Sequence, residues 1–285
     1  MTITIRDAEP ADAARFGQII FDGFAALADH HRFPRDFPSA EVASDIAAML
    51  LSHPAFAGVA AEADGAVIGC NFVNVSPFIA GIGPITVDPA VQNRGVGRAL
   101  MQAVMEKAQA RALPAVRLVQ AAYHNRSLCL YTSLGFQTRE PLSVLTGTPL
   151  GLRFPGYEVR VAESADLPAC DALCRAVHGF DRAGELAEAV ASGSAHVVEH
   201  LGRIAGYTTG IGFFAHSVAE NHQALKALIG AAIEITGPGF LLPTRNYDVL
   251  SWCLAHGLRL VMQMTLMTIG PYQEPEGAWL PSILY

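Results

Sequence analysis

The sequence predicts an α/β protein made of two similar domains, each a mixed, mostly antiparallel sheet flanked by helices. Apolar residues alternate as in strands and then recur at helical spacing, in turn, along the whole chain. Residues 160–166 (RVAESAD) match residues 6–12 (RDAEPAD) at five of seven positions, which indicates an internal duplication. The Gly- and Pro-rich stretch 147–156 has little periodicity, so we expect domains at 1–148 and 155–285.

The elements of the first half follow from local patterns. An initial strand, TITIRDA, precedes two stretches with apolar residues at helical spacing, and Ser39 is the expected N-cap of the second. Asp64-Gly65 between two apolar runs predicts a β-hairpin. A strand ending ITV then leads through a glycine-bearing turn into a long amphipathic helix. A strand, a helix and a last strand complete the half, at AVRLVQA, HNRSLCLYTSLGF and REPLSVLT.

Composition excludes several classes of protein. With 285 residues, 51% of them hydrophobic and 16% charged, the chain can bury a core, so neither disorder nor a small disulfide-stapled module fits. Nineteen basic and 26 acidic residues give a net charge of −7, and no basic cluster occurs, so no nucleic-acid partner is expected. The N-terminus lacks a signal-peptide pattern and no apolar run is long enough to span a membrane. We therefore expect a cytoplasmic protein without a membrane partner.

The cysteines and histidines do not predict a metal site. Five cysteines, an odd number without a CxxC pair, are typical of reduced thiols in a core. Cys170 and Cys174 have the spacing of one helical turn, but no second close pair of ligands accompanies them. Only His196 and His200 among the histidines of the second half share helical spacing, and the sequence around them resembles a strand. We expect no metal.

The turn in VDPAVQNRGVGRALM is the most informative segment. Gln92, Gly95 and Gly97 form a Q-x-x-G-x-G turn between an apolar strand and a helix. Main-chain N–H groups and the positive end of the helix dipole converge there, and missing Cβ atoms let phosphate oxygens approach closely. A Rossmann motif needs a third glycine and a later acidic residue, and a P-loop needs Gly-Lys-Ser/Thr; neither is present. On this turn alone, the glycines could also serve only a tight connection.

The surrounding order of elements resembles the GNAT superfamily of acyl-CoA-dependent N-acyltransferases. The family's strand ending Val-x-Pro, its Q/R-x-x-G-x-G/A turn and its next helix stand here as ITVDP, QNRGVG and RALM. A second family motif stands as Asn125, Leu130, Tyr131 and Leu-Gly-Phe at 134–136. The resemblance covers roughly residues 3–145. It implies direct transfer of an acetyl group from acetyl-CoA to a primary amine.

The resemblance also implies roles for individual residues. Tyr131 matches the phenol that protonates the departing CoA thiolate, and Asn125 matches a side chain that hydrogen-bonds the cofactor arm. A phenol of pKa about 10 can donate to a thiolate whose conjugate acid has a pKa of about 8.5. The alternative for Tyr131 is an aromatic on a buried helix face. The expected cofactor-binding residues are Ile85, Thr86 and Val87 on the strand and Gln92, Asn93, Arg94, Gly95, Val96, Gly97 and Arg98 in the turn.

The general base stays open, because the strand AGIGPITV before the turn has no carboxylate. A water chain is one alternative, and the candidate side chains are Asp29, His30, His31, Glu62 and His124. A covalent acyl-enzyme is not expected, since neither a G-x-S-x-G elbow nor a cysteine beside a motif histidine is present.

The second half is expected to be a degenerate copy. Matching KALIGAA to RALMQAV, at an offset of 128, places residues 220–225 opposite the glycine turn and removes both glycines. At an offset of 122, Cys253 replaces Tyr131. We therefore expect this half to bind no CoA and to complete the acceptor cleft. The end of the chain, QEPEGAWLPSILY, is expected to be an ordered arm at the domain junction or a dimer interface.

The acceptor is expected to be a small-molecule or peptide amine of unknown identity, and a homodimer stays open. The alternative function is a non-catalytic acyl-CoA-binding or interaction module. A third is a relative that acts on a hydroxyl or carries a longer acyl chain. Intact Gly95, Gly97, Asn125 and Tyr131 favour an enzyme.

Overall fold

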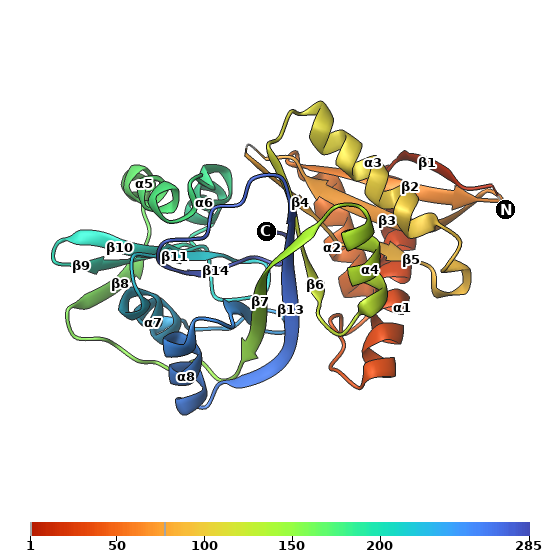
Figure 1. The fold of residues 1–285 in the computed structure, drawn as a ribbon. Coiled ribbons are helices and arrows are strands. Elements are labelled where there is room, and N and C mark those ends of the chain that lie inside the picture. The colour runs from red at the N-terminus through yellow and green to blue at the C-terminus, as the bar shows by residue number, and fades with distance from the viewer. Residues whose placement is uncertain (1, 77) are drawn as a thin grey trace. The chain divides into compact units, whose positions relative to one another are not determined.

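The computed structural model describes residues 2–76 and 78–285, which form two compact units (Figure 1). The first unit contains the chain up to Arg139 together with Leu266–Pro271 and Leu284–Tyr285. The second contains Glu140–Thr265 and Tyr272–Ile283. Two strands, β7 (Gln137–Thr146) and β13 (Arg259–Ile269), therefore contribute residues to both units.

The first unit contains a sheet with the strand order β1-β2-β3-β4-β6, and β5 also pairs with β3. All of these pairs are antiparallel except β4 with β6, which is parallel. The elements are β1 (Thr4–Asp7), α1 (Ala13–His31), α2 (Ala40–Ser52), β2 (Phe56–Ala63), β3 (Ala66–Asn74), β4 (Ile79–Ile82), β5 (Thr86–Val87), α3 (Val96–Ala110), β6 (Ala115–Ala121) and α4 (Asn125–Ser133).

Alternation along the strands divides the core of this unit between the two faces of the sheet. Val59 and Ala61 pack with Leu100 and other residues of α3, whereas Ala60, between them, packs with Phe16 and other residues of α1 and α2 (Figure 1). The predicted cap and hairpin are confirmed. Ser39 accepts the Val42 N–H, and Asp64 and Gly65 form the turn between β2 and β3 with positive φ angles of 52° and 78°.

The second unit contains an antiparallel sheet of order β14-β11-β10-β9-β8, and β12 pairs with residues 142–145 of β7. Cys170 and Cys174 lie in its core among apolar side chains. The elements are β8 (Tyr157–Val161), α5 (Leu167–His178), α6 (Ala183–Ala191), β9 (His196–His200), β10 (Arg203–Thr208), β11 (Ser217–Ala219), α7 (His222–Ala231), β12 (Phe240–Pro243), α8 (Tyr247–Ala255) and β14 (Ala278–Leu280).

An arginine clamp near the start of each unit shows that one plan occurs twice. Arg6 donates from Nη1 and Nη2 to the two oxygens of Asp12 at 2.7 and 2.8 Å, and from Nε to Glu62 at 2.7 Å. The second unit repeats these bonds atom for atom in Arg160, Asp166 and Glu199. The fold class is therefore as predicted. The domain limits 1–148 and 155–285 stay a prediction, because the compact units divide at residue 139 and each takes in a later segment.

The last two residues belong to the first unit. A Cβ on Gly81 would lie 2.0 Å from the Leu284 carbonyl oxygen, so glycine at this position makes room for the tail. Gly81 is paired with Arg117 of β6, whose buried guanidinium donates to the Tyr285 phenol and lies 4.4 Å from the ring centroid. The predicted ordered arm is thus present, with β14 in the sheet of the second unit. None of the helices in the described part of the chain has the length and apolar character of a membrane-spanning segment.

Deleting Leu284 and Tyr285 should lower the free energy of unfolding by about 2–4 kcal/mol, because a buried guanidinium loses a partner. Thermal melts followed by circular dichroism measure this loss as a lower Tm. Tyr285→Phe, which removes only the hydroxyl, should produce a smaller decrease. An unchanged Tm in the deletion variant would show that the tail does not contribute to the core.

Candidate active site

One extra residue interrupts the strand formed by β4 and β5. Val73 of β3 pairs with Ile82, and Cys70 of β3 pairs with Thr86. The step between these pairs is three residues along β3 but four residues along the other strand. This two-against-one mismatch is a β-bulge. Pro84 lies within it and has no N–H to donate to a ladder.

The bulge separates β5 from β6. β4 pairs with β6 as far as Ile82 and Leu118, whereas β6 continues to Ala121 without a partner in β5. β5 pairs with β3 instead. Two adjacent parallel strands therefore diverge immediately before the predicted cofactor turn.

The pairing of β5 with β3 decides which of Ile85, Thr86 and Val87 have main-chain N–H and C=O groups that are not used by the sheet. The Asp88 N–H donates to the Ile68 carbonyl at 2.9 Å, so Thr86, two residues earlier, also directs its main-chain groups at β3. By alternation, Val87 and Ile85 direct theirs to the opposite side. The sheet thus uses the main chain of Thr86, while Val87 and Ile85 face the diverging side.

The turn between β5 and α3 depends on left-handed backbone at two positions. Asn93 has φ 66° and Gly95, the N-cap of α3, has φ 84°. A Cβ on Gly95 would meet no atom within 4 Å, so the backbone conformation and not crowding favours glycine here. Gln92 steadies the turn by donating from its side chain to the Val87 carbonyl at 3.2 Å.

The first turn of α3 presents main-chain donors. Ala99 makes the first bond of the helix, to the Gly95 carbonyl, so the N–H groups of residues 96–98 precede the intrahelical ladder. A Cβ on Gly97 would make only ordinary contacts, 3.5 Å from Leu130 and 3.9 Å from Val87. Neither packing nor backbone conformation in the protein therefore requires glycine at position 97. An anion approaching these amides would require it.

Helix α4 is tied to this turn by two arginines. Arg126 donates to Asn93 at 3.1 Å and also to Gln92, and Arg98 donates to Ser133 at 2.6 Å. Arg126 was not predicted as a site residue, since nothing in its sequence position connects α4 with a turn more than thirty residues earlier. Arg94 is exposed at the turn.

The predicted acid, Tyr131, is buried on α4. Burial raises the pKa of its phenol to about 12, and a hydrogen bond from Ser127 acts in the opposite direction. The Ser127 hydroxyl oxygen lies 2.5 Å from Nδ1 of His124. Asn125 is the first residue of α4 and is exposed.

Two of the candidate bases are held in ion pairs. Asp29 accepts from Arg35 at 2.6 Å, and Glu62 is part of the Arg6 clamp. Hydrogen bonding to Arg35 lowers the pKa of Asp29. Neither carboxylate can take a proton from a substrate without giving up its guanidinium partner.

A different acidic residue, Asp36 in the loop between α1 and α2, lies near the start of α4. Burial raises the pKa of its carboxyl to about 6. Its charge adds to burial in raising the pKa of Tyr123 to about 12. The Tyr123 ring stacks on Phe33 at 4.3 Å and lies 5.0 Å from the His31 ring. The sequence offered no signal for Asp36 except its place between aromatic residues.

The second unit lacks the turn that is predicted to hold the cofactor. Residues 88–95 separate β5 from α3, whereas only 220 and 221 separate β11 from α7. The predicted match of residues 220–225 to 92–97 is therefore wrong, because α7 already begins at His222 and Leu225 is buried in it. Asn221 caps the helix by accepting the Ala224 N–H at 3.0 Å. The turn has been removed, not only its glycines.

The match of Cys253 to Tyr131 agrees with the structure. Helices α4 and α8 both have nine residues, and the two side chains occupy the same position in each. Cys253 is buried, and burial raises the pKa of its thiol to about 12.

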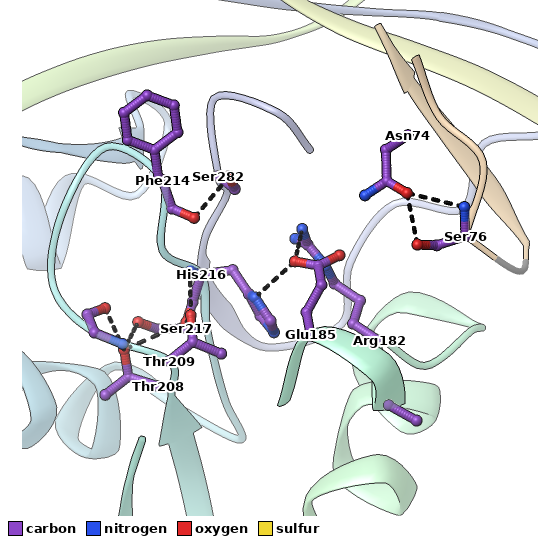
Figure 2. A network of polar contacts seen from close by, with 12 residues as sticks. Asn74, Ser76, Arg182, Glu185, Thr208, Thr209, Phe214, His216, Ser217 and Ser282 are labelled. Atoms are coloured by element: carbon purple, nitrogen blue, oxygen red, sulfur yellow. Dashed lines mark hydrogen bonds and ion pairs between the residues drawn. The ribbon is translucent and has the colours of Figure 1, made fainter. Parts of the chain in front are cut away.

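Arg182, Glu185 and His216 form a polar network in the second unit (Figure 2). Glu185 pairs with Arg182 at 2.6 Å and lies 3.5 Å from Nδ1 of His216, whose Nε2 is 3.2 Å from the Tyr207 hydroxyl. Burial, followed by the charge of Arg182, lowers the pKa of His216 to about 4. Within residues 2–76 and 78–285, no three His, Cys, Asp or Glu side chains are grouped as metal ligands would be.

In the first unit, a bulged strand thus diverges from its parallel neighbour beside a glycine turn and a helix N-terminus. Residues 24–136 match the Acetyltransferase (GNAT) family. The chain therefore contains a domain of the GNAT acetyltransferase family, as its motifs predicted.

One curated relative is similar in sequence, and two solved structures are similar in fold. The mycothiol acetyltransferase of Thermomonospora curvata is 38% identical over 90 residues, which are 31% of this chain and 30% of that enzyme, so the chain spans under a third of this relative. A Pyrococcus horikoshii protein assigned as an acetyltransferase has the same fold, with a TM-score of 0.74 over 99% of this chain and 92% of its own, at 17% identity. A tandem GNAT protein from the clavulanic acid biosynthesis pathway gives 0.57 over 95% and 100%, at 15% identity.

Asp36→Asn should stabilise the protein at high pH. The folded-state pKa of about 6 exceeds the ordinary value, so ionised Asp36 opposes folding above pH 6 and this opposition disappears as the pH falls towards 4. We expect a gain of about 1–2 kcal/mol at pH 8 and none near pH 4, measured by urea denaturation. Asp29→Asn, at an exposed ion pair, is the control and should give no such gain. Equal stability of the Asp36 variant and wild type at pH 8 would contradict the burial of this charge.

Proposed function

We propose that the first unit transfers an acetyl group from acetyl-CoA directly to a primary amine. The observation that carries this proposal is the divergence of β5 from β6 beside the open N-terminus of α3. An acyl-CoA has one extended amide-bearing arm and one pyrophosphate, and the site offers a strand edge for the first and helix amides for the second.

The pyrophosphate would be held by residues 92–98. The amides of Val96, Gly97 and Arg98 and the dipole of α3 favour an anion there, and Arg94 and Arg126 add positive charge. The pantetheine arm would pair with the main chain of Ile85 and Val87, with Asn125 at the start of α4 as a further partner. An N–H in this region would polarise the thioester carbonyl, a contribution of about 3 kcal/mol per donor in acyl transfer generally.

The chemistry is a direct attack of the amine on the thioester carbon. The carbon–nitrogen bond forms, the carbon–sulfur bond breaks, and the phenol of Tyr131 donates its proton to the CoA thiolate. With a pKa of about 12, this phenol is protonated at neutral pH and available as an acid. Burial raises the pKa of Cys70, so this thiol also stays protonated and is a poor nucleophile.

Asp36 would bind the acceptor. A carboxylate with a pKa near 6 is ionised at neutral pH and attracts an ammonium group, and the rings of Tyr123 and Phe33 offer an aromatic surface beside it. This favours a cationic small-molecule or peptide amine. The second unit, which has no turn and caps its own helix amides with Asn221, would bind no CoA.

The function is tested by following thiol release from acetyl-CoA with a panel of primary amines, polyamines and aminoglycosides, with alcohols as comparison acceptors. We expect release that depends on an amine. CoA binding without turnover on any acceptor would replace the proposal by the non-catalytic module, and absence of CoA binding would contradict both.

Tyr131→Phe should lower kcat by about 10²-fold, because the leaving thiolate loses its proton donor. The ring of the variant keeps its edge contact with Phe136, at 6.1 Å between centroids, so the fold should be preserved. Steady-state kinetics with a good amine substrate measure the change. A kcat within about twofold of wild type would disprove the acid role.

Gly97→Ala should separate stability from function. Alanine in the first turn of a helix is favoured over glycine by about 0.5–1 kcal/mol, while its methyl group would stand among the amides of the turn. We expect a slightly higher Tm and a KM for acetyl-CoA raised about tenfold. Gly184 occupies the same second position of α6 with no atom near its Cβ, so Gly184→Ala is a matched control. An unchanged KM in the Gly97 variant would remove this turn from the cofactor site.

A further inference from the structure

Three side chains at the start of α4, His124, Ser127 and Tyr131, follow one another along one side of the helix. His124 is the N-cap, Ser127 is the third residue of the helix and Tyr131 the seventh, so all three lie on one side of it. Nδ1 of His124 is 2.5 Å from the Ser127 hydroxyl oxygen, and Ser127, one helical turn before Tyr131, lowers the pKa of the Tyr131 phenol as a hydrogen-bond partner. The three side chains thus lead from a half-buried residue at the helix end to a buried acid.

The corresponding helix of the second unit, α8, has an ordinary N-cap residue at the position of His124. Asn246 is the N-cap of α8, and its side chain accepts the N–H of Val249, the third residue, at 3.2 Å. His124 makes no such cap bond in α4. A good N-cap contributes about 1 kcal/mol to a helix, so α4 forgoes stability at this position.

All three side chains differ between the two helices. In α8, asparagine, valine and cysteine replace the histidine, serine and tyrosine of α4, and the asparagine and valine cannot relay a proton to the seventh residue. The unit that lacks the predicted cofactor turn therefore also lacks both groups that would relay a proton to the buried seventh residue. A purely structural role for the serine and histidine does not explain this joint absence.

We propose that His124 and Ser127 return a proton to Tyr131 during acetyl transfer. This proposal rests on the proposed function of the first unit. The acceptor amine supplies the proton that the relay carries, His124 accepts it, and Ser127 acts through Tyr131 by passing it on.

The proton balance closes within the reaction. Attack of the amine on the thioester carbon leaves a positively charged nitrogen, whose proton passes to Nε2 of His124. Nδ1 of His124 gives its proton to the Ser127 oxygen, the Ser127 hydroxyl proton passes to the Tyr131 oxygen, and the phenol proton of Tyr131 goes to the CoA sulfur. The carbon–nitrogen bond forms, the carbon–sulfur bond breaks, and each relay residue ends neutral.

The electrostatic surroundings keep His124 neutral before the reaction. Burial, then the charges of Arg126 and His31, lower the pKa of His124 to about 4, so at neutral pH one ring nitrogen carries a proton and the other can accept one. The hydrogen bond from Ser127 favours the phenolate form of Tyr131, which is the form that must be reprotonated.

Ser127→Ala and His124→Asn test the relay. The asparagine variant reproduces the cap of α8 and should fold at least as well as wild type. We expect kcat to fall about tenfold or more in each variant, the KM for acetyl-CoA to change less than twofold, and the two losses not to multiply in the double variant. Cys129→Ala, at an exposed position of the same helix, is the control and should leave kcat unchanged.

The decisive comparison repeats Ser127→Ala in a Tyr131→Phe background, in which no phenol is left for the relay to reprotonate. We expect no further loss of kcat there. A wild-type-like kcat for Ser127→Ala alone, or the same loss in both backgrounds, would overturn the relay. If wild type turns over no amine at all, the proposed function fails and the relay fails with it.

Discussion

The extra residue between Ile82 and Thr86 is the constraint on which the arrangement of the proposed site in the first unit depends. It shifts the register of one strand on β3 by a single position and so ends the pairing of β4 with β6 at Leu118. A regular strand would continue that pairing and occupy the main-chain groups of Val87. Because the strands diverge instead, the edge of β5, the turn after it and the first amides of α3 are arranged along one path.

Several residues around this path lower the stability of the folded protein, so stability does not explain why they are present. Gly97 stands in a helix where alanine would fit, Asp36 is a carboxyl in surroundings that disfavour its charge, and His124 leaves its helix without a cap bond. Each choice costs the folded state free energy that a neighbouring substitution could recover. These three residues lie in the first unit, near α4 and the predicted cofactor turn. The second unit instead has the ordinary solution at the equivalent places, with Asn221 and Asn246 as working helix caps.

The sequence was sufficient for features set by local patterns and insufficient for those set by register or long-range contact. Period and turn chemistry predicted the hairpin at Asp64 and a helix after the glycine turn, although α3 begins at Val96 and so includes Gly97, which the motif placed in the turn. The bulge at Pro84 depends on pairing with a distant strand, and the proximity of Asp36 to Tyr123 depends on how two loops fold together. The wrong match of residues 220–225 to the glycine turn has a similar cause. The helix motif shared by the two halves sets an offset in the sequence, but it does not reveal that the loop before the helix is shorter in the second unit. Cytoplasmic location and a homodimer stay predictions.

The central claim is that one of two related units retains a cofactor site. Isothermal titration of the full chain with CoA tests it most directly, because the stoichiometry counts the sites without any knowledge of the acceptor. The account predicts one CoA per chain. Two per chain would show that the second unit binds without the turn, and none would show that the divergent strand and the glycine turn do not form a cofactor site.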